Sequence, residues 1–260
     1  MIVLNEYTWA ERAVNEHDLG KKPSETLSRV AKYYAYLGMK KRDVRKKLEE
    51  FLYSCDQNIV LSKWDGTLDR LTRNAFKYDL IMLDSICVTD EELEIIQRVD
   101  GKQAQRLAFT LLCIAKYRNE ISGRSDGWVN TPDSEIMKMA NIHTSIKRQC
   151  KLYSQLRDSG LIRFAKNVDN LSVQVLFICT GTQAIIINDF RNLGYQYDRH
   201  FGGPFYVCVN CGITDRIRDS GSSNHRPKKY CPDCAAKIKL RQNVESVMRS
   251  RKASKQNNKV

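Results

Sequence analysis

Apolar residues in the first 100 positions recur at spacings of three and four, which is typical of amphipathic helices. The helices that this spacing predicts cover residues 24–38, 42–55, 61–77 and 89–99. Thr89 and Glu92 have the spacing of a capping box at the start of the last of these helices. The apolar stripes have the form of a core-facing surface and not of a cofactor site. We therefore expect residues 1–100 to form a helical scaffold or partner-binding domain.

Between residues 101 and 190 the apolar period changes from that of a helix to that of a strand. The first predicted elements are a helix over residues 103–117 and a short helix that begins at Thr131 and Pro132. A third helix follows His143 or Thr144 and ends at Gly160, and strands cover residues 161–165 and 171–177. A further strand over residues 182–189 could extend the sheet of the two strands or pack across it. The order resembles a winged helix-turn-helix domain, a fold that serves in DNA binding and also in protein docking.

The third helix of this domain has one apolar and one polar side. Ile146, Cys150, Tyr153 and Leu156 recur at spacings of four, three and three, which predicts that they face the core. The opposite side suits a DNA major groove, because Arg can contact guanine, Gln can contact adenine and Lys can neutralise a phosphate. An ordinary solvated helix face is the alternative. The DNA-contacting residues predicted for this domain are Thr144, Arg148, Lys151, Gln155 and Lys166.

Four of the nine cysteines form two Cys-x2-Cys pairs that are separated by 19 residues. Two residues between cysteines let both thiolates turn toward one ion, and two such pairs complete a tetrahedron. The sequence predicts that one structural Zn²⁺ binds Cys208, Cys211, Cys231 and Cys234, because four thiolates leave no position for a catalytic water. A redox dithiol and an iron–sulfur cluster are the alternatives. We assign residues 205–240 to a zinc ribbon.

The formal net charge of +13 is concentrated toward the end of the chain. Residues 1–100 carry 16 basic and 18 acidic side chains, whereas residues 201–260 carry 13 basic and 4 acidic ones. Such asymmetry is typical of a chain whose distal part meets a polyanion, whereas solubility alone does not require charges to cluster. The phosphate-contacting residues predicted for the ribbon and tail are Arg226, Lys228, Lys229, Lys237, Lys239 and Arg241.

Two further segments complete the predicted organisation. Residues 191–204 are rich in aromatic residues and are assigned to a linker, whose rings either pack the ribbon against the winged helix or stack on bases. Residues 241–260 are assigned to a basic flexible tail that is disordered beyond Ser250 until it meets a partner. The predicted fold class is mainly α with small β: a helical domain, a winged helix-turn-helix, a zinc ribbon and a tail.

Several classes of protein do not fit the sequence. No apolar run approaches the roughly 18 residues of a membrane helix, and Glu6 and Glu11 lie where a signal peptide would be apolar, so we expect a cytoplasmic protein with no membrane partner. No phosphate-binding glycine loop, nucleophile elbow or HExxH motif is present. His225 between the cysteine pairs invites comparison with HNH nucleases, but 19 residues leave little room for that catalytic unit and no second histidine is near. We expect no enzyme, with a nuclease as the least favoured alternative.

The run at residues 189–197 (DFRNLGYQY), the winged-helix segment and the run at residues 229–234 (KYCPDC) resemble a group of poorly characterised proteins from phages, plasmids and integrative elements of Firmicutes. The resemblance spans nearly the whole chain. It implies a mobile-element context, a cytoplasmic location and a DNA-related role, and it supplies no catalytic residues.

These observations lead to two functional hypotheses. The first is a non-enzymatic protein that binds double-stranded DNA and acts in transcription regulation or replication initiation of its element, with steeply salt-dependent affinity. The second is a protein-binding adaptor or inhibitor that uses the same modules to engage host machinery, such as RNA polymerase or a defence nuclease, with residues 1–100 as a candidate surface for the host partner. A homodimer is compatible with both.

Overall fold

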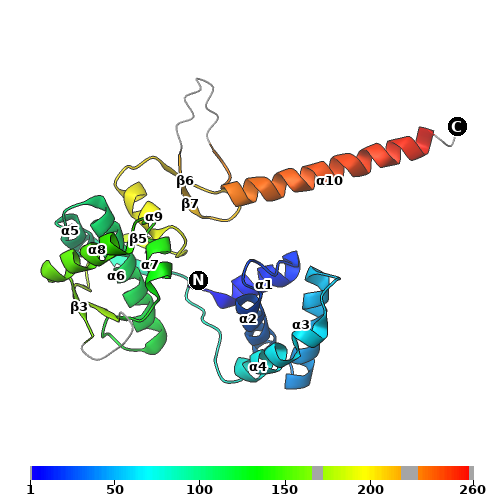
Figure 1. Ribbon diagram of the computed structural model, residues 1–260, viewed down its shortest axis with the longest axis horizontal. Coiled ribbons are helices and arrows are strands. Elements are labelled where there is room, and N and C mark those ends of the chain that lie inside the picture. The colour runs from blue at the N-terminus through cyan, green and yellow to red at the C-terminus, as the bar shows by residue number, and fades with distance from the viewer. Residues whose placement is uncertain (1, 166–171, 218–227, 258–260) are drawn as a thin grey trace. The chain divides into compact units, whose positions relative to one another are not determined.

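The computed structural model describes residues 2–165, 172–217 and 228–257, with side chains described through Ser250. The chain is mainly helical with small β-sheets, which confirms the predicted fold class at that level (Figure 1). It divides into two compact units. Unit 1 comprises Met1–Ile86 and Ile186–Phe190, and unit 2 comprises Cys87–Ile185 and Arg191–Val260. Lys166, Arg226 and His225 lie outside the described residues.

Unit 1 is built from amphipathic helices around one apolar core. Its helices are α1 (Glu6–Glu16), α2 (Pro23–Tyr36), α3 (Lys41–Cys55), the 3-10 turn η1 (Leu61–Lys63) and α4 (Asp65–Ala75). Leu27, Leu48 and Leu68 are fully buried and belong to the cluster that joins α2, α3 and α4. The spacing of apolar residues located these three helices. Helix α1 was missed, and the Asn5 side chain begins it by accepting a hydrogen bond from the backbone N–H of Thr8 at 3.0 Å.

A buried carboxylate joins α1 to the rest of unit 1. Glu6 is buried, and its Oε2 accepts hydrogen bonds from Lys32 Nζ at 2.7 Å and from the backbone N–H of Ile81 at 3.2 Å. Arg29 lies 3.5 Å from Glu6 Oε1. A buried charge is tolerated only when it is paired and hydrogen-bonded, and Glu6 meets both conditions. The first turn of α1 is therefore fixed against α2 by charge as well as by packing.

Unit 2 is organised around one buried helix, α6 (Lys102–Ser122). The sequence predicted a helix over residues 103–117 with one buried face, and the run from Leu107 to Ala115 is buried without interruption. The elements that pack against α6 are α5 (Asp90–Gln97), α7 (Asp133–Met139), α8 (Ile146–Asp158), α9 (Leu193–His200), β2 (Trp128–Val129) and β4 (Val173–Val175). Because α6 has neighbours on every side, it fixes the positions of the other elements of unit 2.

A three-stranded antiparallel sheet covers part of α6. Its strands are β2, β4 and β3 (Ile162–Phe164), in that spatial order, with Val129 opposite Val173 and Ile162 opposite Val175. Strands β3 and β4 were predicted. Strand β2 was not, because two residues are too few to display an alternating pattern. The complete order along the chain is α6, β2, α7, α8, β3, β4.

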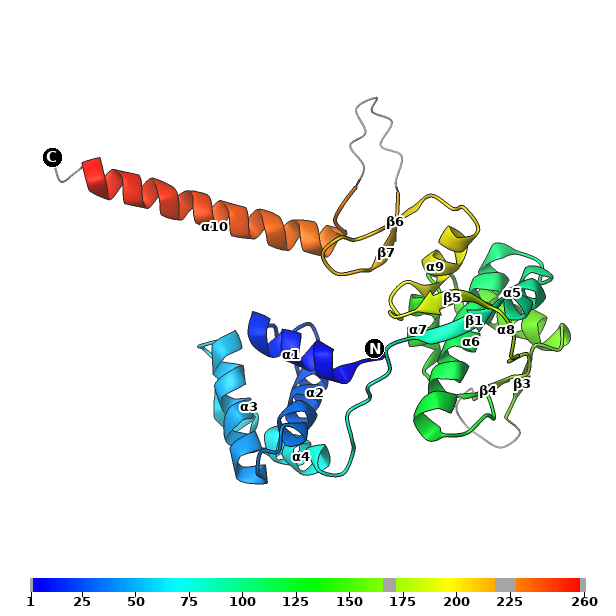
Figure 2. The ribbon, with the colours of Figure 1, turned by 180° about the vertical axis from the view of Figure 1, so that it is seen from behind.

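A second small sheet pairs β1 (Ile86–Thr89) with β5 (Gln183–Ile187), as Figure 2 shows. Strand β5 was predicted within residues 182–189, but it neither extends nor covers the three-stranded sheet, and β1 was missed. Thr89 and Glu92 form the predicted capping box at the start of α5. The buried Glu92 carboxylate also accepts hydrogen bonds from Lys116 Nζ at 2.7 Å and from the backbone N–H of Cys179 at 2.9 Å. Glu92 therefore joins α5, α6 and the segment before β5.

The segment at residues 191–204, predicted to be a linker, contains helix α9. Leu193 and Tyr197 are buried, and the Tyr197 ring lies 5.2 Å from the ring of Phe109 on α6. Packing, and not base stacking, therefore explains Tyr197. Gly194 permits this arrangement, since a Cβ built on it would lie 2.0 Å from the carbonyl oxygen of Ala140 at the end of α7.

Two local predictions about α7 and α8 were wrong. Thr131 does not cap α7, because Pro132 occupies the N-cap position with extended backbone and Thr131 is buried before it. Ile146 is 78% exposed and Cys150 is exposed, although both were predicted to face the core. The buried residues of α8 all lie in its second half, where the helix packs against α6 and β3. Gly160 follows α8 with a φ of +72°, as predicted for a helix end.

The end of the chain forms a two-stranded sheet and a long helix (Figure 1). Strands β6 (Phe205–Val207) and β7 (Thr214–Arg216) pair antiparallel, with Tyr206 opposite Asp215. Helix α10 covers Pro232–Asn257. The disorder expected beyond Ser250 is therefore not observed, because the helix continues seven residues further. The first turn of α10 contains Cys234, which belongs to the second cysteine pair.

We expect Gly194→Ala to destabilise unit 2 by about 1–3 kcal/mol, because the added methyl group would force α9 away from the end of α7. Urea unfolding followed by circular dichroism measures the change. The matched control is Gly66→Ala on α4, where a Cβ meets nothing within 4 Å and should stabilise unit 1 by about 0.5–1 kcal/mol. Equal stability of Gly194→Ala and the unaltered protein would contradict the close approach of α9 and α7.

Candidate metal centre and nucleic-acid interface

The four paired cysteines come together in one cluster. The Sγ atoms of Cys208, Cys211, Cys231 and Cys234 all lie within 4.8 Å of one another. The Sγ atoms of Cys211 and Cys231 are 3.7 Å apart. Three of the four cysteines are buried, and Ile213 is the one further apolar residue packed against them among the described residues. We call residues 205–217 and 228–235 the four-cysteine module.

Local backbone geometry positions each cysteine pair. After Cys208 the chain turns sharply, with the backbone N–H of Gly212 donating to the carbonyl oxygen of Cys208 at 2.9 Å. Gly212 has a φ of +73°, a conformation that side-chain-bearing residues rarely adopt. The second pair lies at the start of α10, where the N–H of Ala235 donates to the carbonyl oxygen of Cys231 at 2.9 Å. A bond from the N–H of Val209 to the carbonyl oxygen of Lys229 joins the two halves.

The surroundings of the cluster favour the thiolate at one position, Cys208, whereas burial raises the pKa of the Cys211 and Cys231 thiols. Burial raises the pKa of the Cys208 thiol, but hydrogen bonds from the backbone N–H groups of Cys231, Cys211 and Asn210 oppose it and lower the pKa to about 6. The side-chain Nδ2 of Asn210 donates to Cys234 Sγ at 3.3 Å. Thiolates are the form in which cysteine binds metals, and four of them at this separation can surround one ion. The cluster is therefore a candidate metal site.

Hydrogen bonds attach the four-cysteine module to the rest of unit 2. Arg191 Nη2 donates to the carbonyl oxygen of Cys211 at 2.6 Å, and Asn192 Nδ2 donates to the carbonyl oxygen of Thr214 at 2.9 Å. Asn192 Oδ1 in turn accepts from Asn141 Nδ2 at 3.0 Å. Asn141 lies in the turn between α7 and α8, so the module and this turn share one chain of hydrogen bonds.

Sequence reasoning missed Arg191, Asn192 and Asn141. Both asparagines have a φ of 55°, in the left-handed region that asparagine enters more readily than most residues. An Asn after a helix is a signal for a left-handed turn. Their contacts, however, span 51 residues between Asn141 and Asn192, and a local pattern cannot reveal such pairs.

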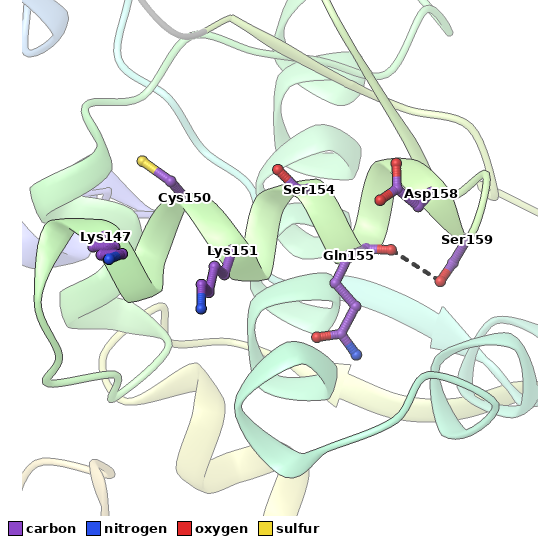
Figure 3. A pocket seen from close by; sticks show the side chains of 7 residues that line it. All are labelled: Lys147, Cys150, Lys151, Ser154, Gln155, Asp158 and Ser159. Carbon is purple, nitrogen blue, oxygen red and sulfur yellow. Dashed lines mark hydrogen bonds between the residues drawn. The ribbon is translucent and has the colours of Figure 1, made fainter.

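The exposed side of α8 carries cations that have no acidic partner in the part of the chain that the structure describes. Lys147, Arg148 and Lys151 are exposed, and we call these three residues the α8 basic face. The one acid within α8, Asp158, pairs with Arg157 at 2.8 Å. Among the described residues, none forms an ion pair with the α8 basic face. In Figure 3, Lys151 and Gln155 extend from one side of α8, whereas Cys150, Ser154 and Asp158 extend from another.

The residues of α8 and its preceding turn that were predicted to contact DNA differ in their exposure to solvent. Arg148 and Lys151 are exposed, as a DNA contact requires. Thr144 is half-buried in the turn before the helix. Gln155 is half-buried, and its Nε2 donates to the carbonyl oxygen of Asp100 at 2.6 Å, so this amide already has a partner within the fold. Lys147 was missed because the sequence placed the apolar side of α8 at Ile146 and Cys150.

The predicted phosphate contacts of the ribbon and tail lie on the surface wherever they are described. Lys228 and Lys229 precede the second cysteine pair, and Lys237, Lys239 and Arg241 lie on α10; all five are exposed. Each is therefore accessible to a ligand. Among the described helices, none is both long enough and apolar enough to cross a membrane.

Neither protein-family models nor curated proteins nor solved structures match the chain. The candidate sites therefore rest on the residues and their geometry alone.

Substitution of one clustered cysteine should remove the bound metal. We expect the unaltered chain to bind one metal ion, and Cys231→Ser to lose it because three thiolates hold an ion more weakly than four. Elemental analysis of the purified proteins measures the content. Cys150→Ser is the matched control, since Cys150 is exposed on α8 and outside the cluster. Equal metal content in Cys231→Ser and Cys150→Ser would contradict a four-cysteine site.

Proposed function

We propose that the chain is a non-enzymatic protein that binds double-stranded DNA through a winged helix-turn-helix domain in which α8 is the recognition helix. The observation that carries the proposal is the α8 basic face: Lys147, Arg148 and Lys151 lie together on an exposed helix surface and have no acidic partner among the described residues. The domain runs from α6 to β4. The four-cysteine module and α10 add further cations.

The order of elements supports the winged-helix assignment. From α6 to β4 the elements follow in the order helix, strand, helix, helix, strand, strand, and β2 lies at the edge of the sheet next to β4. This arrangement is expected of a winged helix. Tyr153 on α8 is buried and its hydroxyl donates to Asp133 Oδ1 on α7 at 3.0 Å, while Leu156 packs in the core. One side of α8 is thereby held by the fold, and the α8 basic face is left for a ligand.

The chemistry of the exposed side of α8 suits a DNA groove. Arg148 can form paired hydrogen bonds with guanine, and Lys147 and Lys151 can neutralise phosphates. Ile146, exposed at the first turn of the helix, is an apolar group of the kind that contacts the methyl group of thymine. We leave Gln155 out of the interface because its amide donates to Asp100. Thr144 lies at the margin of the proposed interface.

We propose Zn²⁺ as the metal of the four-cysteine module. Four cysteine ligands from two Cys-x2-Cys pairs are typical of structural zinc, which would stabilise a segment that has almost no apolar core of its own. Such a module, a zinc ribbon, would present Lys228 and Lys229 beside the metal, and α10 would present Lys237, Lys239 and Arg241. These five cations would contact phosphates without reading bases.

One observation favours the second candidate function, a protein-binding adaptor. Helix α10 exposes four large apolar residues at spacings of four, three and one, namely Leu240, Val244, Val247 and Met248. An exposed apolar stripe on a helix is a feature of protein-docking surfaces. An adaptor would keep its function when the α8 basic face is neutralised, which separates the two candidates experimentally.

Neutralisation of the α8 basic face tests the proposal. Arg148→Gln combined with Lys151→Gln should weaken binding to duplex DNA, because one guanine contact and one phosphate contact are lost. It should lower the slope of log affinity against log salt by about 0.9, because Lys151 supplies one of the phosphate contacts. Fluorescence anisotropy with a labelled duplex, titrated across salt concentrations, measures both quantities.

The matched control is Lys40→Gln combined with Lys41→Gln, which removes the same charge from exposed positions of unit 1. This control should change the slope little. If both double variants bind duplex DNA with the affinity and salt slope of the unaltered protein, α8 is not the DNA-binding helix.

A further inference from the structure

A pocket separate from the α8 basic face lies in unit 2, where α6 begins and α9 ends. It has a volume of about 580 Å³, a size typical of small-ligand sites. Its walls come from the start of α6, the end of α9 and strands β6 and β7. The lining residues that the argument uses are Gln97, Lys102, Arg106, Asp198, Phe201 and Arg216.

The pocket carries an excess of positive charge. Arg106 and Asp198 form an ion pair, with Arg106 Nε 3.0 Å from Asp198 Oδ2, and so balance each other. Lys102 and Arg216 are exposed, and neither forms an ion pair with any described residue. Two cations thus remain for an anionic ligand. The first residue of α6 is Lys102, so the positive end of that helix adds to their field.

Aromatic and amide groups accompany these cations. Phe201 is 43% exposed although it lies against the Tyr197 and His200 rings at centroid distances of 5.0 and 4.9 Å. An exposed aromatic ring held by its neighbours is a platform on which a flat base can stack. Gln97, which is exposed at the rim, can donate and accept hydrogen bonds. The pocket therefore combines a stacking surface with phosphate-binding groups.

We propose that this pocket binds one nucleotide of an unpaired strand, with the base stacked on Phe201 and the phosphate held by Lys102 and Arg216. The proposal deepens the proposed function and rests on it. Lys102 is two residues after Asp100, whose carbonyl oxygen accepts the hydrogen bond from Gln155 on α8. The pocket and the α8 helix are therefore neighbours, and the protein should bind best where duplex DNA meets a single strand.

Three probes distinguish the pocket from the duplex-binding surface. The full chain, loaded with zinc, is titrated with a blunt duplex, with the same duplex carrying a short oligothymidylate overhang, and with oligothymidylate alone. We expect the overhang to raise affinity about tenfold over the blunt duplex, the gain typical of stacking one base. Phe201→Leu should abolish this gain and leave blunt-duplex affinity unchanged.

Lys102→Gln combined with Arg216→Gln provides a second variant that leaves the apolar core intact. It should lower the salt slope for oligothymidylate by about 0.7, since both side chains hold the same phosphate and one neutralised phosphate contributes about 0.7 for a single strand. The matched controls are Phe76→Leu, an exposed aromatic residue of unit 1, and Lys40→Gln with Lys41→Gln. Neither control should alter the preference for the overhang.

The groups of the pocket could bind a free nucleotide or a nucleotide within a strand, and competition by free ligands distinguishes these two cases. Thymidine monophosphate should compete weakly for the overhang-dependent binding, and inorganic phosphate should not compete at equal concentration. Tight binding of the free mononucleotide, with no gain from the overhang, would overturn the unpaired strand as the ligand. Equal affinity of Phe201→Leu and the unaltered chain for the overhang duplex would overturn the pocket assignment. Loss of blunt-duplex binding by Arg148→Gln with Lys151→Gln, observed at the same time, would leave the proposed function standing.

Discussion

The burial of α6 is the constraint on which the arrangement of unit 2 depends. Between Leu107 and Ala115 this helix has no exposed residue, so it must be covered on every side, and α5, α7, α8, α9 and two strands provide that cover. Each covering element is fixed on the side that faces α6. The α8 basic face lies on an element that α6 holds in place, and the pocket beside Lys102 lies between the start of α6 itself and the end of α9. The packing of one apolar helix thus determines where the candidate sites lie.

The four-cysteine module depends on a different interaction. It has almost no apolar core, so a bound metal would supply order that packing does not, together with hydrogen bonds to the two residues that precede α9. Arg191 and Asn192 supply those bonds, and Asn192 also contacts Asn141 in the turn before α8. A change in the module would therefore reach the base of the proposed recognition helix through two side chains. Under the proposed function, a metal in this module would support the proposed nucleic-acid interface.

Features that depend on residues close together in the sequence could be predicted, whereas contacts between residues far apart in the sequence could not. Helices α2 to α4 and the cysteine pairs follow from spacings of a few residues, which the chain must satisfy wherever it folds. Strands β1 and β2 were missed because they are short, and the inner side of α8 was misjudged because its first turn lies outside the core. Arg106 and Asp198, 92 residues apart, line a pocket that only tertiary structure assembles. Sequence chemistry selected Arg148 and Lys151 on α8, whereas only the fold shows that the Gln155 amide has a partner within unit 2 and that Lys147 is exposed.

The most direct test of the account is a lysine-modification footprint of the zinc-loaded chain with and without duplex DNA. An amine-reactive acylating reagent labels exposed lysines, and mass spectrometry measures the extent at each position. We predict that duplex DNA reduces labelling of Lys147 and Lys151 and leaves Lys40 and Lys41 unchanged, all four being exposed in the free protein. Unchanged labelling of Lys147 and Lys151 under conditions where DNA is bound would contradict the assignment of α8 as the DNA-binding helix.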